Sequence, residues 1–207
     1  MRQKTVVIVD YNLGNLHSIH GAVKKVGHIP KISNNPSVIG KADCLILPGV
    51  GAFKNGMDYL SEVGLVDVLA ENVFERKTPI LAICLGMQLL ARESSEFGKH
   101  AGLGWINASV EKINSEDKTL RIPHVGWNEC HFQKESPLFK GIKNRELFYY
   151  THSYYFSTDD DIVIGKCDYG KEFTVAIQKD NIFATQFHPE KSQLAGLTLI
   201  KNFIEID

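Results

Sequence analysis

The chain has 207 residues, of which 43% are hydrophobic and 23% charged, and its formal charge at pH 7 is -1. These values are ordinary for a globular protein, and this length can bury a core without cross-links. A charge so near zero argues against nucleic acid as the main partner, since nucleic-acid binders usually present a basic face. We therefore expect a single domain over residues 1–207.

The cysteines lack the spacing of a zinc site or of a disulfide framework. They are Cys44, Cys84, Cys130 and Cys167. No segment resembles a signal peptide, and no apolar run reaches the roughly 18 residues of a membrane span. These features predict a cytoplasmic protein with free thiols, and we expect neither a metal nor a cofactor.

The first half of the chain alternates strand-like and helix-like segments. Three short apolar runs predict strands buried on both faces: Thr5–Val9, Cys44–Leu47 and Ile80–Ile83. Apolar residues at steps of three and four predict helices at residues 16–26, 65–74 and 85–91. This alternation indicates an α/β fold with a doubly wound, mostly parallel sheet of the flavodoxin-like kind.

The second half of the chain is rich in short β-like runs. They lie at residues 105–113, 127–132, 148–150, 162–167 and 173–178. A last buried strand is expected at residues 182–187, and a final helix at Gln193–Ile204. Because helical patterns are scarce between these runs, we expect an antiparallel extension of the sheet.

Cys84 lies between a predicted strand and a predicted helix, with Ala82 two residues before it and Gly86 two after it. Small residues at these positions suit a nucleophile elbow, a tight turn that lifts a reactive side chain clear of the sheet. A helix N-terminus favours a thiolate, and the amide N–H of Leu85 would be aimed at an oxyanion. A buried structural cysteine is the alternative, since free cysteines are often buried.

A cysteine nucleophile needs a base, and the base needs an orienting partner. His188 follows the last predicted strand, at the same sheet edge as Cys84, and Glu190 comes two residues later. An extended backbone through Pro189 would put both side chains on one side. The alternative is a surface histidine beside a surface glutamate.

Other segments supply candidates for an oxyanion hole and a substrate pocket. An N–H group of Val50 or Gly51 could assist Leu85, although residues 48–51 could also be only a tight turn. Gln88 lies one helical turn after Cys84, and Glu96 is a carboxylate that could receive a substrate amino group. Residues 150–154 could form a pocket wall or simply pack across strands.

Together these segments resemble the class I (triad) glutamine amidotransferases. Residues 82–88 and 187–190 are similar to the nucleophile and the His-Pro-Glu motifs of that family, and residues 48–51 to its oxyanion strand. Residues 10–16, 123–128, 150–155 and 188–192 narrow the resemblance to glutaminase subunits of imidazole glycerol phosphate synthases, over residues 6–203. Where the family usually has glycine, this chain has Ala82, which adds a methyl group at a crowded turn.

The resemblance implies roles for particular residues. Cys84 would form a glutamyl thioester, His188 would relay protons, and Glu190 would orient His188. Glutamine binding carries over to Gln88, to Glu96 and to the backbone around His152, Ser153 and Tyr154. The residues that match those facing the partner are Asn15, Trp127 and Lys191.

The resemblance also implies a partner and a pathway. The partner would be a (β/α)8 barrel cyclase in a heterodimer, which uses the ammonia to make imidazole glycerol phosphate and aminoimidazole carboxamide ribotide in histidine biosynthesis. The family's free subunit is nearly inactive, because its oxyanion loop must be reoriented on docking or on substrate binding.

Three other functions fit parts of the same sequence. Related glutaminase subunits supply ammonia for amidino groups on cell-surface sugars, which keeps the chemistry and changes its destination. A Cys-His protease or chaperone-like hydrolase on a related fold would cleave peptides instead. A non-catalytic binding module would leave Cys84 unlabelled by glutamine-mimicking reagents.

Overall fold

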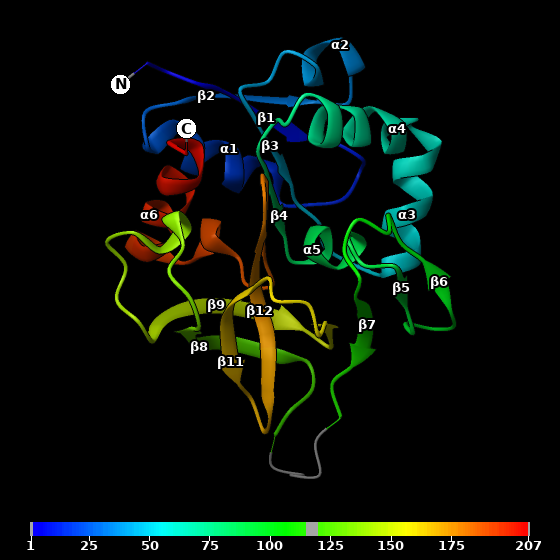
Figure 1. The fold of residues 1–207 in the computed structure, drawn as a ribbon, viewed down its shortest axis with the longest axis vertical. Helices are drawn as coiled ribbons and strands as arrows, with labels where there is room; N and C mark the ends of the chain where they lie inside the picture. The colour runs from blue at the N-terminus through cyan, green and yellow to red at the C-terminus, as the bar shows by residue number, and fades with distance from the viewer. Residues whose placement is uncertain (1, 115–119, 207) are drawn as a thin grey trace.

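The computed structural model describes residues 2–114 and 120–206, whose strands join in a single 13-stranded sheet (Figure 1). Strand pairing runs from a parallel half, built by the first part of the chain and by its last strand, to a mostly antiparallel half, built mainly by the second part. Among the described residues, none of the helices has the length and apolar character needed to cross a membrane.

The parallel half contains five strands and confirms the predicted fold class. Their spatial order is β2 (Ile29–Ser33), β1 (Thr5–Val9), β3 (Cys44–Leu47), β4 (Ile80–Ile83) and β13 (Ile182–Thr185). This is the 2-1-3-4-5 order of flavodoxin-like sheets, in which ligands bind beyond the carboxyl ends of the strands.

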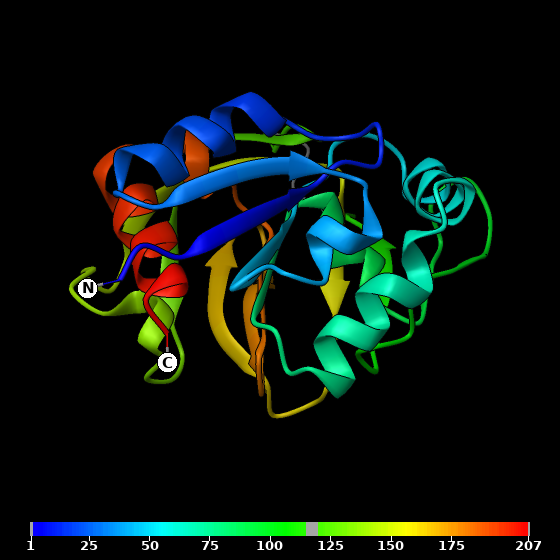
Figure 2. The same ribbon diagram turned by 90° about the horizontal axis from the view of Figure 1, so that it is seen from above.

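Helices cover both faces of the parallel half because its strand residues alternate between two cores (Figure 2). In β1, Val6 and Ile8 face one core, while Val7 and Val9 face the other. The first face carries α1 (Leu16–Lys25) and α6 (Gln193–Ile204). The second carries α2 (Pro36–Ile39), α3 (Phe53–Glu62), α4 (Leu65–Ala70) and α5 (Leu85–Leu89).

The antiparallel half extends the sheet from β13, as predicted. Its strands are β12 (Glu172–Lys179), β11 (Val163–Asp168), β10 (Tyr154–Ser157), β9 (Glu146–His152), β8 (His124–Phe132), β7 (Ser109–Lys112), β6 (His100–Ala101) and β5 (Glu93–Ser94). β12 pairs with β13, β10 and β11, and β8 joins β11 to β9. The segment between β9 and β10 reaches the carboxyl edge of the parallel strands, where it completes the site described below.

Several elements of the structure lack the sequence patterns that predicted the others. β2, at the sheet edge, contains Pro30 and has no fully buried residue, so it lacks the apolar run that marked the other strands. α3 contains Gly56, which packs closely on Leu89 and weakens the helical pattern. α2, β5, β6 and β10 were also not anticipated.

Several predicted elements differ in extent from those in the structure. The strand expected at residues 127–132 begins earlier, as β8, and the one expected at 148–150 is longer at both ends, as β9. The strand expected at residues 182–187 ends at Thr185, as β13. The helix expected at residues 65–74 divides into α4 and a π-helical turn, η1 (Glu71–Glu75). The strand expected at residues 105–113 shortens to β7. The remaining helical turns are 3-10 segments, η2 (Pro137–Phe139) and η3 (Pro189–Lys191).

Candidate active site

Cys84 occupies a strained turn between β4 and α5. Its backbone has φ 55° and ψ -109°, a conformation that residues with a side chain rarely adopt. The turn is possible because Gly86 is in van der Waals contact with β3: a Cβ there would lie 2.0 Å from the carbonyl oxygen of Leu47. The extra methyl group of Ala82 is fully buried in the core on the α3 and α5 face.

His188 follows β13, which lies parallel to β4 with Thr185 opposite Ile83. The two strands therefore end at the same edge and bring His188 and Cys84 to one pocket. The Nδ1 atom of His188 lies 2.8 Å from Oε1 of Glu190, and the two side chains are only 2% and 1% exposed.

The backbone conformation that was predicted to bring Glu190 to His188 was wrong. An extended backbone through Pro189 was expected, whereas residues Pro189–Lys191 form the 3-10 helix η3. The short helix curls the chain so that the Glu190 carboxylate returns to the ring of His188. The two residues meet because the chain turns.

The protonation of His188 depends on its two neighbours. Burial by itself lowers the pKa of His188, but interactions with Cys84 and Glu190 outweigh burial and raise it to about 10. Because Nδ1 faces a carboxylate, it carries a proton. The Nε2 atom is buried without a hydrogen-bond partner among the described residues, so it is available to the Cys84 thiol.

Cys84 and His188 line a pocket of about 300 Å³ at the carboxyl edge of the sheet. The other predicted site residues that line it are Val50, Gly51, Leu85, Gln88, Glu96, His152, Ser153 and Tyr154. Glu190 lies behind His188 and does not reach the pocket surface. Segments far apart in sequence thus supply one concave site, with the size and mixed polarity of a small-molecule pocket.

The oxyanion hole expected from Leu85 is not formed in this conformation. The N–H of Leu85 donates to the carbonyl oxygen of Gly49 at 3.4 Å, so it does not point free into the pocket. Just upstream, the Tyr11 hydroxyl donates to the Pro48 carbonyl at 2.5 Å and holds the start of this turn. Rotation of the peptide after Gly49 is therefore needed before Leu85 can bind an oxyanion.

Gln88 and Glu96 both line the pocket, but each already has protein partners. The Gln88 amide donates to the Tyr154 carbonyl at 3.1 Å. A carboxylate oxygen of Glu96 accepts the N–H of Phe53 at 2.6 Å, at the first residue of α3. Glu96 is therefore anchored at the pocket rim, and its other carboxylate oxygen accepts no hydrogen bond among the described residues.

His152 belongs to a chain of polar groups that the sequence analysis did not anticipate. Its Nδ1–H donates to the Tyr154 carbonyl at 2.8 Å, and its Nε2 lies 3.1 Å from Nδ1 of His124. His124 is stacked between Tyr150 and Tyr169. Burial lowers the pKa of His152 to about 3 and that of His124 to about 4, so both rings are neutral and serve as fixed hydrogen-bonding groups.

The residues expected to face a partner lie outside the pocket. Trp127 is 46% exposed and shares a surface hollow of about 500 Å³ with Leu147 and Leu194. The exposed Lys191 holds its ammonium 5.5 Å from the ring centroid of Tyr149. Asn15 precedes α1, and its side chain makes no capping hydrogen bond.

Thr151 lines the pocket together with residues 152–154, as expected of the pocket wall at residues 150–154. Two residues at the site were not predicted to belong to it. Pro123 lines the pocket without any chemical signature. Gln186 is fully buried behind the pocket, and its amide nitrogen lies 3.6 Å from the sulfur of Cys84. A polar residue inside an otherwise apolar strand end is the signal that could have identified it.

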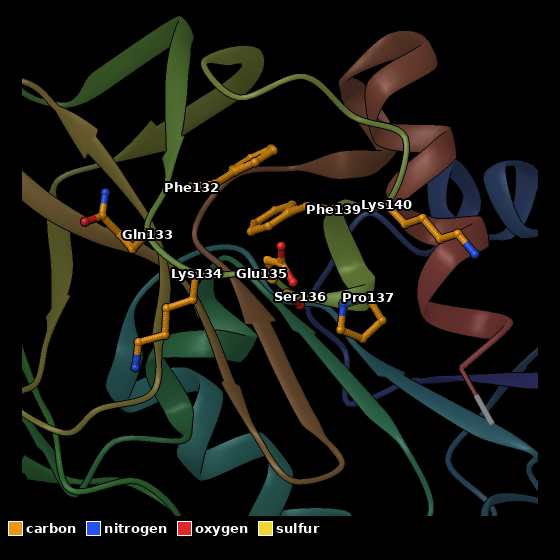
Figure 3. Close-up of a pocket in the computed structure, with 8 residues that line it drawn as sticks. All are labelled: Phe132, Gln133, Lys134, Glu135, Ser136, Pro137, Phe139 and Lys140. Carbon is orange, nitrogen blue, oxygen red and sulfur yellow. The ribbon is translucent and has the colours of Figure 1, made fainter.

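Figure 3 shows a hollow of about 680 Å³ on the segment after β8, where Phe132 and Phe139 stack with centroids 3.9 Å apart. None of the predicted site residues lines this hollow. Within the described residues there is no group of three metal-ligating side chains. The chemistry-bearing residues are concentrated in the Cys84 pocket.

Comparison with known proteins identifies the family. The sequence profile of the class-I glutamine amidotransferases matches residues 7–206. The chain therefore belongs to this family.

More specific likeness comes from curated relatives named imidazole glycerol phosphate synthase subunits. HisH 1 of Campylobacter jejuni (strain RM1221) is 49% identical over 97% of this chain and 100% of its own length. HisH of Methanocaldococcus jannaschii is 46% identical over 96% of this chain and 98% of its own. Among solved structures, PurLQS from Thermotoga maritima shares the fold with a TM-score of 0.74 at 17% identity, covering 98% of both chains.

Proposed function

We propose that this chain is the glutaminase subunit of an imidazole glycerol phosphate synthase. It hydrolyses the side-chain amide of L-glutamine and passes the ammonia to a (β/α)8 barrel cyclase subunit in a heterodimer. The names and near-complete coverage of the HisH relatives support this destination and do not favour amidino-sugar synthesis. A cytoplasmic location is part of the proposal, because a reducing compartment keeps the free Cys84 thiol reactive.

One observation carries the proposal: Cys84 and His188 meet in one pocket, and His188 is held by Glu190. This arrangement has the parts of a Cys-His-acid triad. The raised pKa of His188 supports a thiolate–imidazolium pair, since the charged ring is stabilised by Cys84 and Glu190. Gln88, Glu96 and the backbone of residues 152–154 would bind the amino-acid part of glutamine.

The reaction needs no group beyond glutamine and water. The Cys84 thiolate attacks the side-chain carbonyl carbon, and the carbonyl electrons move onto oxygen. When they return, the C–N bond breaks, and nitrogen leaves as ammonia with a proton from His188. His188 then takes a proton from water, whose oxygen attacks the thioester, and glutamate leaves as the Cys84 sulfur is released.

The position of Gly49 supports regulation by the partner. Its carbonyl engages the Leu85 N–H, so the resting turn would leave the oxyanion without its main donor. Turning the Gly49–Val50 peptide would free Leu85 and bring the N–H of Val50 toward the substrate. The loss of one such donor costs about 100- to 1000-fold in rate, which accounts for a nearly inactive free subunit.

The test is a glutaminase assay on the purified chain, alone and mixed with a barrel cyclase, with and without the cyclase's nucleotide ligand. We expect ammonia release to be slow for the free chain and to rise with cyclase and ligand present. Cys84→Ala should abolish ammonia release in the complex. Ammonia release by Cys84→Ala at the wild-type rate would refute the triad.

A control variant shows whether a loss of activity is specific to the pocket. Lys54→Ala removes an exposed ion pair with Asp58 on α3, away from the pocket, and should leave the activity of the complex unchanged. If the chain hydrolyses glutamine but no barrel cyclase stimulates the reaction, the proposed glutaminase activity is supported and the proposed partner is rejected.

A further inference from the structure

Gln186 is a fully buried polar residue beside the nucleophile, and the proposed reaction does not use it. Its exposure is 0%, and its main-chain N–H donates to the Val175 carbonyl at 2.8 Å. It follows β13, two residues before His188. A fully buried amide of this kind must satisfy its hydrogen bonds within the protein, so its neighbours define its role.

The orientation of the Gln186 amide follows from the Tyr154 carbonyl, to which it is linked through the side chain of Gln88. Carbonyl oxygens only accept, so the atom of Gln88 that faces the Tyr154 oxygen is its NH2 group. The same NH2 group lies 3.0 Å from Gln186, which must present its oxygen there. The Gln186 nitrogen consequently faces Cys84 and donates to its sulfur at 3.6 Å.

The Tyr154 carbonyl is itself held from a second side. His152 donates its Nδ1–H to this oxygen at 2.8 Å, and both residues line the substrate pocket. A continuous line of hydrogen bonds therefore runs from the pocket wall through Gln88 and Gln186 to the nucleophile. In each of these hydrogen bonds the donor and the acceptor are fixed.

We propose that Gln186 is a positioning residue which donates a hydrogen bond to the Cys84 sulfur, holds it in its reactive rotamer and links that position to the substrate-binding wall through Gln88. The role deepens the proposed glutaminase function and rests on it. An amide donor favours the thiolate over the thiol, because hydrogen bonds to a charged atom are stronger than those to a neutral one. It carries no charge, so it does not compete with the proton transfer of His188.

The decisive variant is Gln186→Met, which keeps the length of the side chain and removes the donor. Cys84 alkylation by iodoacetamide is followed by mass spectrometry across the neutral and alkaline pH range, without glutamine. We expect alkylation at neutral pH to slow by about 10- to 100-fold, the equivalent of one hydrogen bond to a charged group. The pH at half-maximal rate should move upward.

Two other variants separate positioning from a structural role. Gln88→Met does not remove the amide that touches sulfur, but it releases the oxygen of Gln186, so it should shift the alkylation profile in the same direction by less. The matched control is Gln178→Met on β12, where the side chain accepts from Ser136 and is absent from the pocket. It should leave the alkylation profile unchanged.

The pH profile must be assigned to the thiol and not to its neighbours. The titratable groups that interact with Cys84 are His188, on the strand exit, and Tyr11, after β1. Burial, with a smaller contribution from Cys84, raises the pKa of Tyr11 well above its usual value, so it stays neutral throughout. Glu190→Gln provides the reference profile for an altered His188.

Unfolding is excluded by comparing urea midpoints and circular dichroism of every variant with the wild type. If Gln186→Met lowers stability too far, Gln186→Asn, which keeps the amide but withdraws it from sulfur, should give the same alkylation defect. An unchanged profile in a folded Gln186→Met protein would overturn the proposal. The alkylation readout does not need glutamine, so it judges Gln186 even if the glutaminase assay fails.

Discussion

The turns after β3 and β4 lie next to each other at the same sheet edge, yet they are built differently. In the turn after β4, Cys84 is buried, and Gly86 leaves no space for even a methyl group. The other turn is also tightly packed at Gly49, where a Cβ would lie 2.4 Å from the Tyr11 hydroxyl. Beyond Gly49 it is open: Val50 is 38% exposed and Gly51, with φ 99°, has open space where a Cβ would lie. A nucleophile needs one fixed position, whereas an oxyanion turn that responds to a partner needs two.

The strongest test of this contrast replaces Gly86 in one turn and Gly51 in the other by alanine. Gly86→Ala places a Cβ 2.0 Å from the Leu47 carbonyl oxygen, so β3 or α5 must shift. We expect a loss of about 4 kcal/mol or more in the free energy of unfolding. Gly51→Ala meets no neighbour and suffers only backbone strain, about 1–2 kcal/mol.

Both glycine variants are compared by urea denaturation and by soluble yield. Equal losses of stability in the two variants would show that the turn at Gly51 is as tightly constrained as the turn at Gly86.

A second test weakens the interactions that support the Cys84 turn without changing the shape of a side chain. Glu190→Gln removes the charge that helps raise the pKa of His188 and should lower that pKa. Fewer molecules then hold the thiolate–imidazolium pair, so kcat should fall by about 100- to 10,000-fold in the cyclase complex. The measurement is the pH dependence of ammonia release.

The control for this variant is Glu205→Gln, another glutamate near a histidine, His28, at 3.9 Å and outside the pocket. It should leave kcat unaltered. Full activity of Glu190→Gln would mean that His188 needs no charged orienting partner.

The smallest expected effect is on the pH dependence of the free energy of unfolding, and it comes from His152 and His124 in the pocket wall. The folded pKa of His152 is about 3 and that of His124 about 4, below the unfolded value near 6.5. Below pH 6.5 the unfolded chain binds protons that the folded chain refuses, so stability is complete above this pH and is lost as pH falls toward 4 and then 3. His152 alone should account for about 1 kcal/mol between pH 6.5 and 5.5.

Urea midpoints measured across this pH range check the effect. His124→Gln removes one of the two groups and should flatten the dependence, whereas the exposed His17→Gln on α1 should not change it. A wild-type protein whose stability does not vary from pH 7 to pH 4 would contradict the burial of two neutral histidines.

Much of the fold was predictable because it depends on local patterns. The runs Thr5–Val9, Cys44–Leu47 and Ile80–Ile83 are strands with the expected bounds, since buried parallel strands need continuous apolar sequence. The final helix at Gln193–Ile204 was equally clear. β2 escaped notice because an edge strand needs no such pattern, and α3 because Gly56 serves packing against α5.

The candidate site was likewise predictable only where local patterns determine it. Cys84 and His188 could be assigned to one edge from sequence, because parallel strands end together. The contact of Glu190 with His188 was expected for the wrong reason, since a 3-10 turn and not an extended backbone brings it about. A polar residue at an apolar strand end could have marked Gln186 as unusual, but its partners could not be foreseen, because Gln88 and Cys84 lie 98 and 102 residues away in sequence.

The sequence by itself determined which residues could do chemistry and at which rim of the sheet they would gather, because periodicity and strand direction are written locally. Only the tertiary structure decided how they are oriented. The Gly49 carbonyl turned toward Leu85, the amide of Gln186 turned toward sulfur and the neutral His152–His124 pair all depend on packing between distant segments. A peptide plane or an amide has little local preference for one direction, so its orientation is set by the hydrogen-bond partners that the fold supplies.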